Sequence, residues 1–491
     1  MSTLYHKTAQ AFSWSFLDAA VQRCVQLVIG VVLARLLFPE EFGLLGMLLV
    51  FTAVIQAFLD SGFGAALIQK PTVTEIEISS VFYFNLAMGL AGAGCLCLLA
   101  PWIAHFYGQP MLIPLARALS LTLVTNAFGM IQRTLLTKQI NFKTQTKVNL
   151  ISGAISGTIG VTLASMGWGV WSLVIQQVSA SFLSTFSLWC LNPWRPSAAF
   201  SFKALGGMFG FGSRLLASSV LNQVFENIYY VVIGRLFSAA DLGYFTRAKT
   251  LGDTPTSTLS WMIARVTFPV FATVQNDPAR LKRGIRKILA ILFLINCPMM
   301  IGLAVVARPL VVVLLTDKWT PCIVYLQLLC MYGLLYPLHL INLNVLQALG
   351  RSDLFLRLEV IKKIMIVVNI AVAYRWGISA IICGMVAMSI FSLYLNCYYT
   401  GILISYPLQE QFRDIAPYLV VSLLMAVSAY AIGLLPVTIY WLILVLQCTA
   451  GILVYCSLCW IFRLSAFLEL LEIGRTQYQL ITPRSLVNTA S

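Results

Sequence analysis

The amino-acid sequence predicts an all-α polytopic membrane protein with about fourteen transmembrane helices. The first observation is composition: 59% of the 491 residues are hydrophobic and only 10% are charged. Soluble domains carry about 25% charged residues, so this chain lacks the polar surface that a soluble fold needs. The second is a succession of long apolar stretches joined by short loops. The third is the gathering of basic residues in alternate loops, which is typical of a chain that crosses a membrane repeatedly.

A membrane-spanning helix requires about 20 mostly apolar residues. The N-terminal sequence MSTLYHKTAQAFSW runs into an apolar segment without a small-residue cleavage site, so we expect a retained first span and not a signal peptide. A polar tail follows the last span. The predicted spans lie near residues 12–37, 42–60, 79–104, 111–136, 147–166, 168–191, 207–237, 242–274, 287–316, 321–349, 357–374, 376–404, 415–435 and 438–462.

The charges in the loops predict the orientation of these spans. With the N-terminus in the cytoplasm, most Lys and Arg residues fall in cytoplasmic segments. Only six fall in outer loops, namely Arg35, Arg117, Arg235, Arg308, Lys318 and Arg375. A miscounted span would disturb this alternation, so it supports fourteen helices with both termini in the cytoplasm. The net charge of +15 therefore orients helices and does not indicate a nucleic-acid partner.

The two halves of the chain resemble each other. VVLARLLFPEEFG at Val31–Gly43 matches VVIGRLFSAADLG at Val231–Gly243 at an offset of 200 residues. Later pairs, Pro101 with Pro309 and Trp168–Gly169 with Trp376–Gly377, are 208 residues apart, and the eight extra residues fit near 275–282. Six spans separate the equivalent segments, which predicts a parallel repeat of the kind found in secondary transporters. The alternative is chance similarity between apolar segments.

The repeat predicts three parts of the chain. Residues 1–196 form an N-terminal six-helix lobe, residues 197–406 form a C-terminal six-helix lobe, and residues 407–491 add two helices and a cytoplasmic tail.

Ionisable residues inside predicted spans are candidates for function, because each costs about 3 kcal/mol at the bilayer centre. They are Asp18, Arg23, Arg214, Glu226, Arg247, Lys249, Asp253 and Arg265. On the first helix Asp18, Gln22 and Gln26 share one face, and the equivalent helix carries Asn222, Gln223, Glu226 and Asn227. We expect the two polar faces to line one hydrated cavity; the alternative is an internally paired packing network.

The eighth span contains Asp253-Thr254-Pro255, where a proline predicts a break that serves as a hinge or is a passive kink. Lys249 and Asp253 are four residues apart and able to pair. We expect no cofactor or metal: the glycine run Gly206–Ser213 lacks the Lys of a phosphate-binding loop, and Cys456 and Cys459 have no His nearby. No long extramembrane loop offers an active site, so the chain is not expected to be an enzyme.

Four strings carry a family resemblance: LARLLFPEEFGLL, DSGFGAALIQK, ARVTFPVFATVQND and DKWTPCIVYLQLLCMYGLL. Together they resemble the Wzx-type polysaccharide-export flippases of the multidrug/oligosaccharidyl-lipid/polysaccharide superfamily, closest to the colanic-acid-exporter-like branch. The resemblance runs from about Trp14 to about Trp460. It implies two six-helix lobes arranged in a V, followed by two further helices.

The resemblance also implies a substrate, an undecaprenyl-diphosphate-linked oligosaccharide that moves from the cytoplasmic to the periplasmic leaflet of the bacterial inner membrane. Family members use cationic cavity residues against the diphosphate and sugars. The substrate-binding candidates are Arg23 and Arg265, then Arg247, Lys249 and Arg214, with the amides of Gln22, Gln26 and Asn222. The acids Glu226, Asp253 and Asp18 are candidates for a coupling ion.

Three other functions remain open at this point. A multidrug or cation antiporter of the same superfamily would need an acidic cavity to bind cations, whereas the predicted cavity is net basic. A membrane polysaccharide polymerase would need longer loops to carry an active site. A scaffold for a polysaccharide assembly complex would tolerate neutral substitutions in the cavity. A polysaccharide polymerase and a chain-length regulator are also expected as possible partners.

Overall fold

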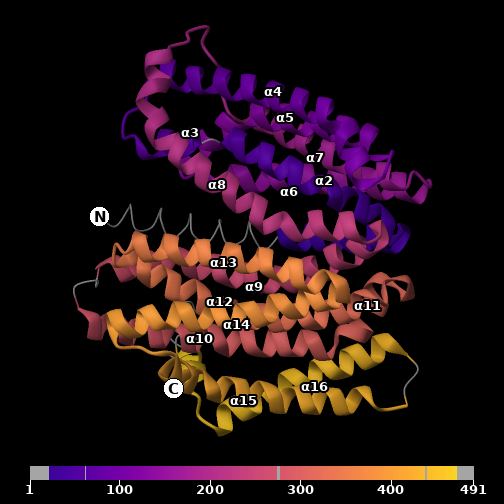
Figure 1. Ribbon diagram of the computed structural model, residues 1–491, viewed down its shortest axis with the longest axis vertical. Coiled ribbons are helices and arrows are strands. Elements are labelled where there is room, and N and C mark those ends of the chain that lie inside the picture. Colours follow the sequence, from indigo (N-terminus) through magenta and orange to yellow (C-terminus); the bar gives the residue numbers. More distant parts are fainter. Residues whose placement is uncertain (1–21, 61, 274–276, 437–438, 473–491) are drawn as a thin grey trace, which may run out of the picture. The chain divides into compact units, whose positions relative to one another are not determined.

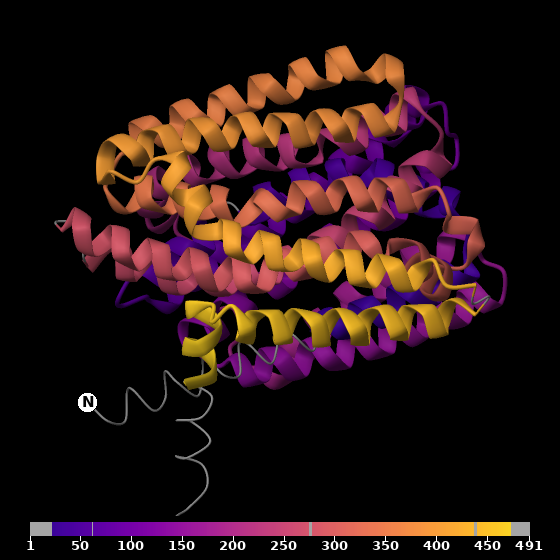
Figure 2. The same cartoon turned by 90° about the horizontal axis from the view of Figure 1, so that it is seen from below.

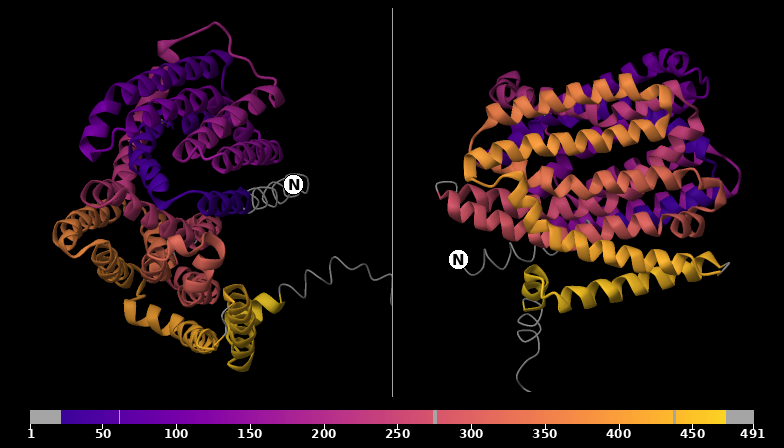
Figure 3. Two further views of the ribbon diagram at one scale, coloured as in Figure 1. Left: turned by 90° about the vertical axis from the view of Figure 1, so that its right-hand side faces the viewer. Right: turned by 60° about the horizontal axis from the view of Figure 1, so that its bottom comes forward.

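The computed structural model describes residues 22–60, 62–273, 277–436 and 439–472, and within them the regular elements are all helices (Figure 1). The chain divides into two compact units, the first ending at Arg247 and the second beginning at Ala248. Within each unit, most helices run across the view of Figure 1, and the left view of Figure 3 shows many of them nearly along their axes.

The first unit begins with a helix over residues 22–36. There follow α2 (Pro39–Asp60), α3 (Phe63–Gln69), α4 (Glu75–Tyr107), α5 (Leu112–Lys138), α6 (Phe142–Ser165), α7 (Val170–Leu191), α8 (Phe202–Leu236) and the start of α9 (Ala239–Thr273). Consecutive helices pack against each other in the pairs α4–α5 and α6–α7, and α2 packs against α8.

The second unit contains the rest of α9, then α10 (Pro278–Val305), α11 (Ala307–Leu315), α12 (Cys322–Ala348), α13 (Ser352–Ala373), α14 (Ile378–Ile404), α15 (Leu408–Gly433) and α16 (Tyr440–Ile461). Single 3₁₀ turns, Asp317–Trp319 and Tyr374–Trp376, precede α12 and α14. Figure 2 shows α15 and α16 side by side, and α15 also packs against α10.

Each predicted span overlaps a helix, but the predicted number of spans is not confirmed. Ten of the described helical segments, with α2 and α3 counted together, are long and apolar enough to cross a membrane. The helix over residues 22–36, α8, α9 and α13 are not among the ten. Only residues 22–36 of the first of these helices are described, which is shorter than a membrane-spanning helix, whereas α8, α9 and α13 each carry several charged residues. Fourteen remains a prediction.

Two details differ from the sequence-based expectations. The span predicted at 287–316 is divided, because α10 ends at Val305 and α11 begins at Ala307. Pro309 has no N–H group to bond the carbonyl of Val305, which accounts for a break at this point. By contrast, α9 is not interrupted at Pro255, since it stays helical from Ala239 to Thr273, and a kink at this proline stays a prediction. Directly before this proline, the Thr254 hydroxyl donates to the carbonyl of Thr250, one turn back, at 2.6 Å.

The ends of the helices agree with the internal repeat. At an offset of 208, the last residue of α4 corresponds to that of α11, the last residue of α6 to that of α13, and the first residue of α7 to that of α14. The sign of φ repeats as well: Gly108 and Thr316 both have positive φ, at 67° and 78°, and so do Gly169 and Gly377, although ψ differs between Gly108 and Thr316. Positive φ values are unfavourable for residues that have a Cβ. Thr316 nevertheless has positive φ at the position that corresponds to Gly108, which supports the repeat.

The helix starts before α2 and α9 repeat too, at an offset of 200. The Phe38 N–H donates to Glu41 Oε2 at 2.7 Å, and the Ser238 N–H donates to Asp241 Oδ2 at 3.3 Å. In both cases a carboxylate three residues on satisfies a backbone donor at the helix start and interacts favourably with the helix dipole. The same local chemistry therefore starts the second helix of each half.

Candidate functional site

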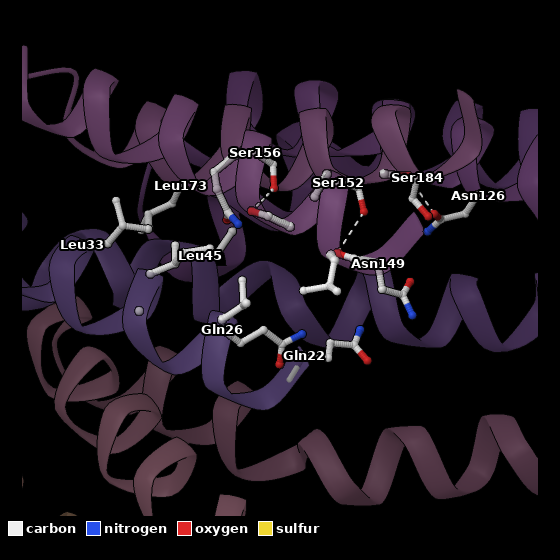
Figure 4. Close-up of a pocket in the computed structure, with 18 of the residues that line it drawn as sticks. Gln22, Gln26, Leu33, Leu45, Asn126, Asn149, Ser152, Ser156, Leu173 and Ser184 are labelled. Atoms are coloured by element: carbon white, nitrogen blue, oxygen red, sulfur yellow. Dashed lines mark hydrogen bonds between the residues drawn. The ribbon is translucent and has the colours of Figure 1, made fainter. Parts of the chain in front are cut away.

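A pocket of 470 Å³ lies within the first unit, among the helix over residues 22–36 and α2, α5, α6, α7 and the first turns of α9 (Figure 4). Its size is that of a small-molecule binding site. Its polar lining consists of amides, hydroxyls and two guanidinium groups: Gln22, Gln26, Asn126, Asn149, Gln176, Ser152, Ser156, Ser181, Ser184, Thr246, Arg133 and Arg247. Among the described residues that line it there is no carboxylate.

One wall of the pocket is a polar stripe on α6. Asn149, Ser152 and Ser156 are spaced by three and four residues, so they share one face of the helix. The two serine hydroxyls donate to carbonyls of their own helix, Ser152 to Val148 at 2.7 Å and Ser156 to Gly153 at 3.2 Å. A hydroxyl used in this way still has acceptor capacity, so this wall offers hydrogen-bonding groups without charge.

Glycines on α6 allow the neighbouring helices to come close. A Cβ at Gly157 would clash with Ile29 of the first described helix, and one at Gly160 would lie 2.7 Å from the Gln176 Cβ on α7. Close approach is the usual reason for small residues between membrane helices. It brings the glutamines of the first helix and of α7 to the edges of the α6 stripe.

Asn126, on α5, is held in position by neighbours on α2 and α7. Its amide nitrogen donates to Gln56 Oε1 at 3.0 Å, and its Oδ1 accepts a hydrogen bond from the Ser181 hydroxyl at 2.7 Å. Ser181 also lies 2.5 Å from the Thr125 hydroxyl. A side chain bonded at both ends of its amide cannot rotate freely, so Asn126 presents a fixed edge to the pocket.

The two guanidinium groups are held by different contacts. Arg133, on α5, donates from Nη2 to the Ser184 hydroxyl at 3.0 Å. Arg247, on α9, lies over the ring of Phe42 at 3.9 Å from the ring centroid. Gly30 faces the same guanidinium, and a Cβ there would lie only 3.1 Å from its Nη1. These two cations give the pocket a positive charge, which favours anionic ligands.

The structure brings three of the predicted site residues together, because Gln22, Gln26 and Arg247 all line this pocket. Arg23 is exposed on the same helix as the glutamines, and Asn222 and Glu226 are exposed on α8; none of the three lines it. Lys249 and Asp253 form the ion pair that their spacing predicts, at 2.9 Å on α9. Asp18 lies outside the described residues, as do the side chains of Arg214 and Arg265.

Sequence reasoning missed the contribution of α5, α6 and α7. The charge pattern places Arg133 among the cytoplasmic charges that orient the helices, and no sequence pattern singles out Asn126 or Gln176. A signal was present: at the offset of 208, the α6 stripe corresponds to Arg357, Val360 and Ile364 on α13. The two serines of the stripe therefore have apolar counterparts in the second half of the repeat. Among the described residues, no group of His, Cys, Asp and Glu could hold a metal ion.

Comparisons with known proteins give relatives of one kind. Residues 32–324 match the family described as "Polysaccharide biosynthesis protein". The chain is 28% identical to the lipopolysaccharide biosynthesis protein WzxC of Escherichia coli (strain K12), with 75% of this chain and 76% of that protein covered. It is 27% identical to the teichuronic acid biosynthesis protein TuaB of Bacillus subtilis (strain 168), over 72% and 74% of the two chains. It is also 27% identical to the succinoglycan biosynthesis transport protein ExoT of Rhizobium meliloti (strain 1021), over 66% of each.

Solved structures share the fold at lower identity. The lipid II flippase MurJ in its inward closed conformation superposes with a TM-score of 0.75 at 17% identity, covering 92% of this chain and 98% of MurJ. An inward-facing multidrug resistance MATE family transporter superposes with a TM-score of 0.62 at 16% identity, covering 78% and 95%. The predicted all-helical membrane fold is confirmed by these similarities.

Proposed function

Because this chain belongs to the polysaccharide biosynthesis protein family, we propose that it is a transporter that moves lipid-linked oligosaccharide units across a membrane during polysaccharide synthesis. The observation that carries the proposal is the pocket of amides, hydroxyls and two guanidinium groups without a described carboxylate. The relatives named for lipopolysaccharide, teichuronic acid and succinoglycan biosynthesis support this substrate class. The carrier lipid that we propose is undecaprenyl diphosphate.

The pocket suits both parts of such a substrate. Sugar hydroxyls donate and accept hydrogen bonds, and so do the amides of Gln26, Asn126 and Gln176. A diphosphate carries negative charge, and a guanidinium group binds it through charge-assisted and frequently bidentate hydrogen bonds. The polyprenyl tail needs no binding site of comparable polarity, because it remains in lipid while the head group is carried.

The mechanism that we propose is alternating access. The first unit holds the head group while the pocket closes to one side of the membrane and opens to the other. The lobes would be residues 1–196 and 197–406, followed by residues 407–491. Other residues, which do not line the pocket, are proposed to contact the head group at other stages of the transport cycle. They are the basic residues Arg23, Arg265, Lys249 and Arg214, and the amide of Asn222. Glu226, Asp253 and Asp18 are proposed as sites for a coupling ion.

The cellular setting is also a proposal. The charge pattern favours cytoplasmic termini, and the substrate class favours the bacterial inner membrane, where lipid-linked units are made at the cytoplasmic leaflet. A polysaccharide polymerase would use the transported units, and a chain-length regulator would act with it.

The test is transport by the purified full-length chain in liposomes. The probe is a polyprenyl-diphosphate trisaccharide with a fluorescent label, and its arrival in the outer leaflet is measured with an impermeant glycosidase. We expect wild-type protein to accelerate transfer at least tenfold over empty liposomes. Arg133→Gln and Gln26→Ala should slow transfer, whereas Gln347→Ala, an exposed change on α12, should not. Transfer at the rate of empty liposomes would contradict the proposal.

Two further measurements separate the alternatives. A cationic-drug antiporter, which the MATE-like fold makes worth testing, predicts increased drug susceptibility in a strain that lacks the gene. A polymerase predicts longer oligosaccharides after incubation with the reconstituted protein. We expect unchanged susceptibility and unchanged oligosaccharide length.

A further inference from the structure

We propose that a cavity of 250 Å³ in the second unit binds the head group of a zwitterionic phospholipid, phosphatidylethanolamine. None of the described residues lines both this cavity and the pocket of the first unit. The inference goes beyond the proposed function, because its ligand is a component of the membrane and not the transported unit. The polar lining comes from three segments: Arg286 and Lys287 on α10, Asp414 and Tyr418 on α15, and Ser465 and Glu469 in the helical segment 465–472.

The cavity lies where the surrounding helices change from charged to apolar residues. Lys287 is the last charged residue of α10, and Asp414 is the last of α15. Helix α16 carries no charged residue, and Arg463 follows two residues after its end. Such charge-free stretches cross the hydrocarbon core, so the charges at their ends lie at the level of the lipid head groups. The cavity is therefore at the depth where a phospholipid presents its phosphate and its amine.

The helical segment 465–472 forms a fixed wall of the cavity. Arg463 has a positive φ of 48°, and the chain turns there, so that the segment runs across the direction of α16 (right view of Figure 3). Leu464 and Ala466 are buried in the hydrophobic core that also contains residues of α10 and α15. Leu470 and Leu471 are 37% and 52% exposed. The segment is thus anchored in the protein core and still offers apolar side chains to lipid.

The cationic side chains of the cavity have hydrogen-bond donors left for a phosphate. Arg286 Nη2 donates to Asp414 Oδ1 at 2.5 Å, and the Tyr406 hydroxyl donates to Asp414 Oδ2 at 2.6 Å. Glu410 lies 3.5 Å from Nη1 of the same arginine. These contacts orient the guanidinium group, but the hydrogen bond to Asp414 uses only one of its five N–H groups. The side chains of Arg286 and Lys287 are 46% and 61% exposed, so both can donate charge-assisted hydrogen bonds to one phosphate.

The acidic side chain beside these cations suits an ammonium group. Glu469 Oε2 lies 2.7 Å from Lys287 Nζ, but it accepts no hydrogen bond from the described residues. The carboxylate therefore keeps acceptor capacity. Ser465 lies four residues earlier, on the same face of the segment, and adds a hydroxyl oxygen. A primary ammonium group carries three N–H donors, which a carboxylate and a hydroxyl can accept.

The balance of charge favours a zwitterionic ligand. The cavity is lined by two cations, Arg286 and Lys287, and two carboxylates, Asp414 and Glu469. A phosphate and an ammonium group on one ligand match both kinds of side chain without leaving a charge unpaired. Phosphatidylglycerol has no cation for Glu469, and phosphatidylcholine has a quaternary ammonium group without N–H donors. Phosphatidylethanolamine supplies both the phosphate and the N–H donors.

The test is a competition among phospholipids with identical acyl chains. Purified full-length protein in detergent receives phosphatidylethanolamine, phosphatidylcholine and phosphatidylglycerol at equal concentrations, and native mass spectrometry measures which lipid is bound. We expect about fivefold preference for phosphatidylethanolamine over either of the others, the effect of charge-assisted hydrogen bonds at a partly exposed site. Glycerophosphoethanolamine, the head group without acyl chains, should compete with the lipid. Inorganic phosphate should compete much less, because it has no ammonium group.

Two substitutions separate the roles of the charges. Glu469→Gln should remove the preference for phosphatidylethanolamine over phosphatidylcholine, while leaving the binding of phosphatidylcholine within about twofold. Lys287→Gln should weaken the binding of all three lipids. Asp353→Asn is the matched control, because the pair Arg351–Asp353 is an exposed ion pair of the same unit, at 3.0 Å, that does not line the cavity. This control should keep the full preference.

Three outcomes would overturn the inference. The first is equal binding of phosphatidylethanolamine and phosphatidylcholine by the wild-type protein, and the second is a preference that survives in Glu469→Gln. The third is tighter binding of phosphatidylglycerol, which would show a basic surface without a site for the ammonium group. None of these outcomes bears on the proposed function, because the transfer of the trisaccharide probe is measured separately in liposomes.

Discussion

Gly43 on α2 and Gly243 on α9 pack against each other's helix in the same way. A Cβ at Gly43 would clash with the carbonyl of Ala239, and a Cβ at Gly243 would clash with the carbonyl of Pro39. All four positions are related by the offset of 200 residues, so the contact is reciprocal, as in an interface with two-fold symmetry. The helix backbones touch here, and Cα–H groups face carbonyl oxygens across the contact. The internal repeat is thus visible as a contact between equivalent residues as well as in the sequence.

The first prediction concerns this contact. Gly43→Ala and Gly243→Ala should each destabilise the protein by about 1–3 kcal/mol, because backbone atoms must move to admit the methyl group. The double variant should cost less than the sum of the two, since the separation forced by one methyl group makes room for the other. Thermal unfolding in detergent measures these differences. Gly94→Ala is the control, because a Cβ on α4 at that position meets nothing within 4 Å.

The second prediction concerns charge in the pocket. Asn126→Asp keeps the shape of the side chain, and Ser181 can still donate to it. Gln56, which accepts from the Asn126 amide, can turn its own amide over and donate instead, so the protein should fold. The new carboxylate would repel the diphosphate, and we expect at least tenfold weaker binding of a polyprenyl-diphosphate trisaccharide. Binding of the same trisaccharide without phosphate should change much less. Equal weakening for both ligands would contradict an electrostatic origin, and Asn126→Ser shows the effect of losing the amide alone.

The third prediction concerns a carbonyl that a proline leaves without its helical partner. Pro298 cannot donate to the carbonyl of Leu294, and the Tyr455 hydroxyl of α16 donates to it instead at 2.7 Å. Tyr455→Phe should therefore cost about 1–3 kcal/mol, because the buried carbonyl loses its donor. In a Pro298→Ala background the same change should cost little, since the alanine N–H can bond Leu294. A thermal double-mutant cycle measures this coupling, and Tyr430→Phe, at an exposed site on α15, is the control.

The fourth prediction concerns acid stability at the start of α4. A hydrogen bond from Lys70 lowers the pKa of Glu77, whose carboxylate also accepts a bond from the Thr74 N–H. A carboxyl group with a depressed folded-state pKa stabilises the protein above its unfolded value of 4.5, and this contribution is lost as the pH falls. The stability difference between wild type and Glu77→Gln should be constant above pH 4.5 and should shrink below it.

In a Lys70→Gln background that pH dependence should be reduced, because the main cause of the shift is gone. Thermal unfolding at a series of pH values measures both comparisons. A difference that persists unchanged at low pH would show that Glu77 acts by packing and not by its charge.

Several features of the site could be read from the sequence because they depend on residues close in the chain. Gln22 and Gln26 share a helix face by spacing alone, and Lys249 and Asp253 pair across one turn. Arg247 stood out as a charge in an apolar segment, which is a local property. By contrast, Arg133 looked like any cytoplasmic loop charge, because its hydrogen bond to Ser184 joins residues far apart in the sequence.

The sequence by itself determined that this chain is an all-helical membrane protein built from a repeat, and where most of its helices lie. Apolar runs, caps and turn residues act within a few residues, so these features follow from local physical chemistry. Only the tertiary structure decided that α5, α6 and α7 share a polar pocket with the first described helix, and that Gly43 meets the start of α9. The reason is that a polar face on a membrane helix is compatible with several arrangements of the neighbouring helices. The helix that packs against it determines whether the face lines a pocket or is buried in a helix–helix contact.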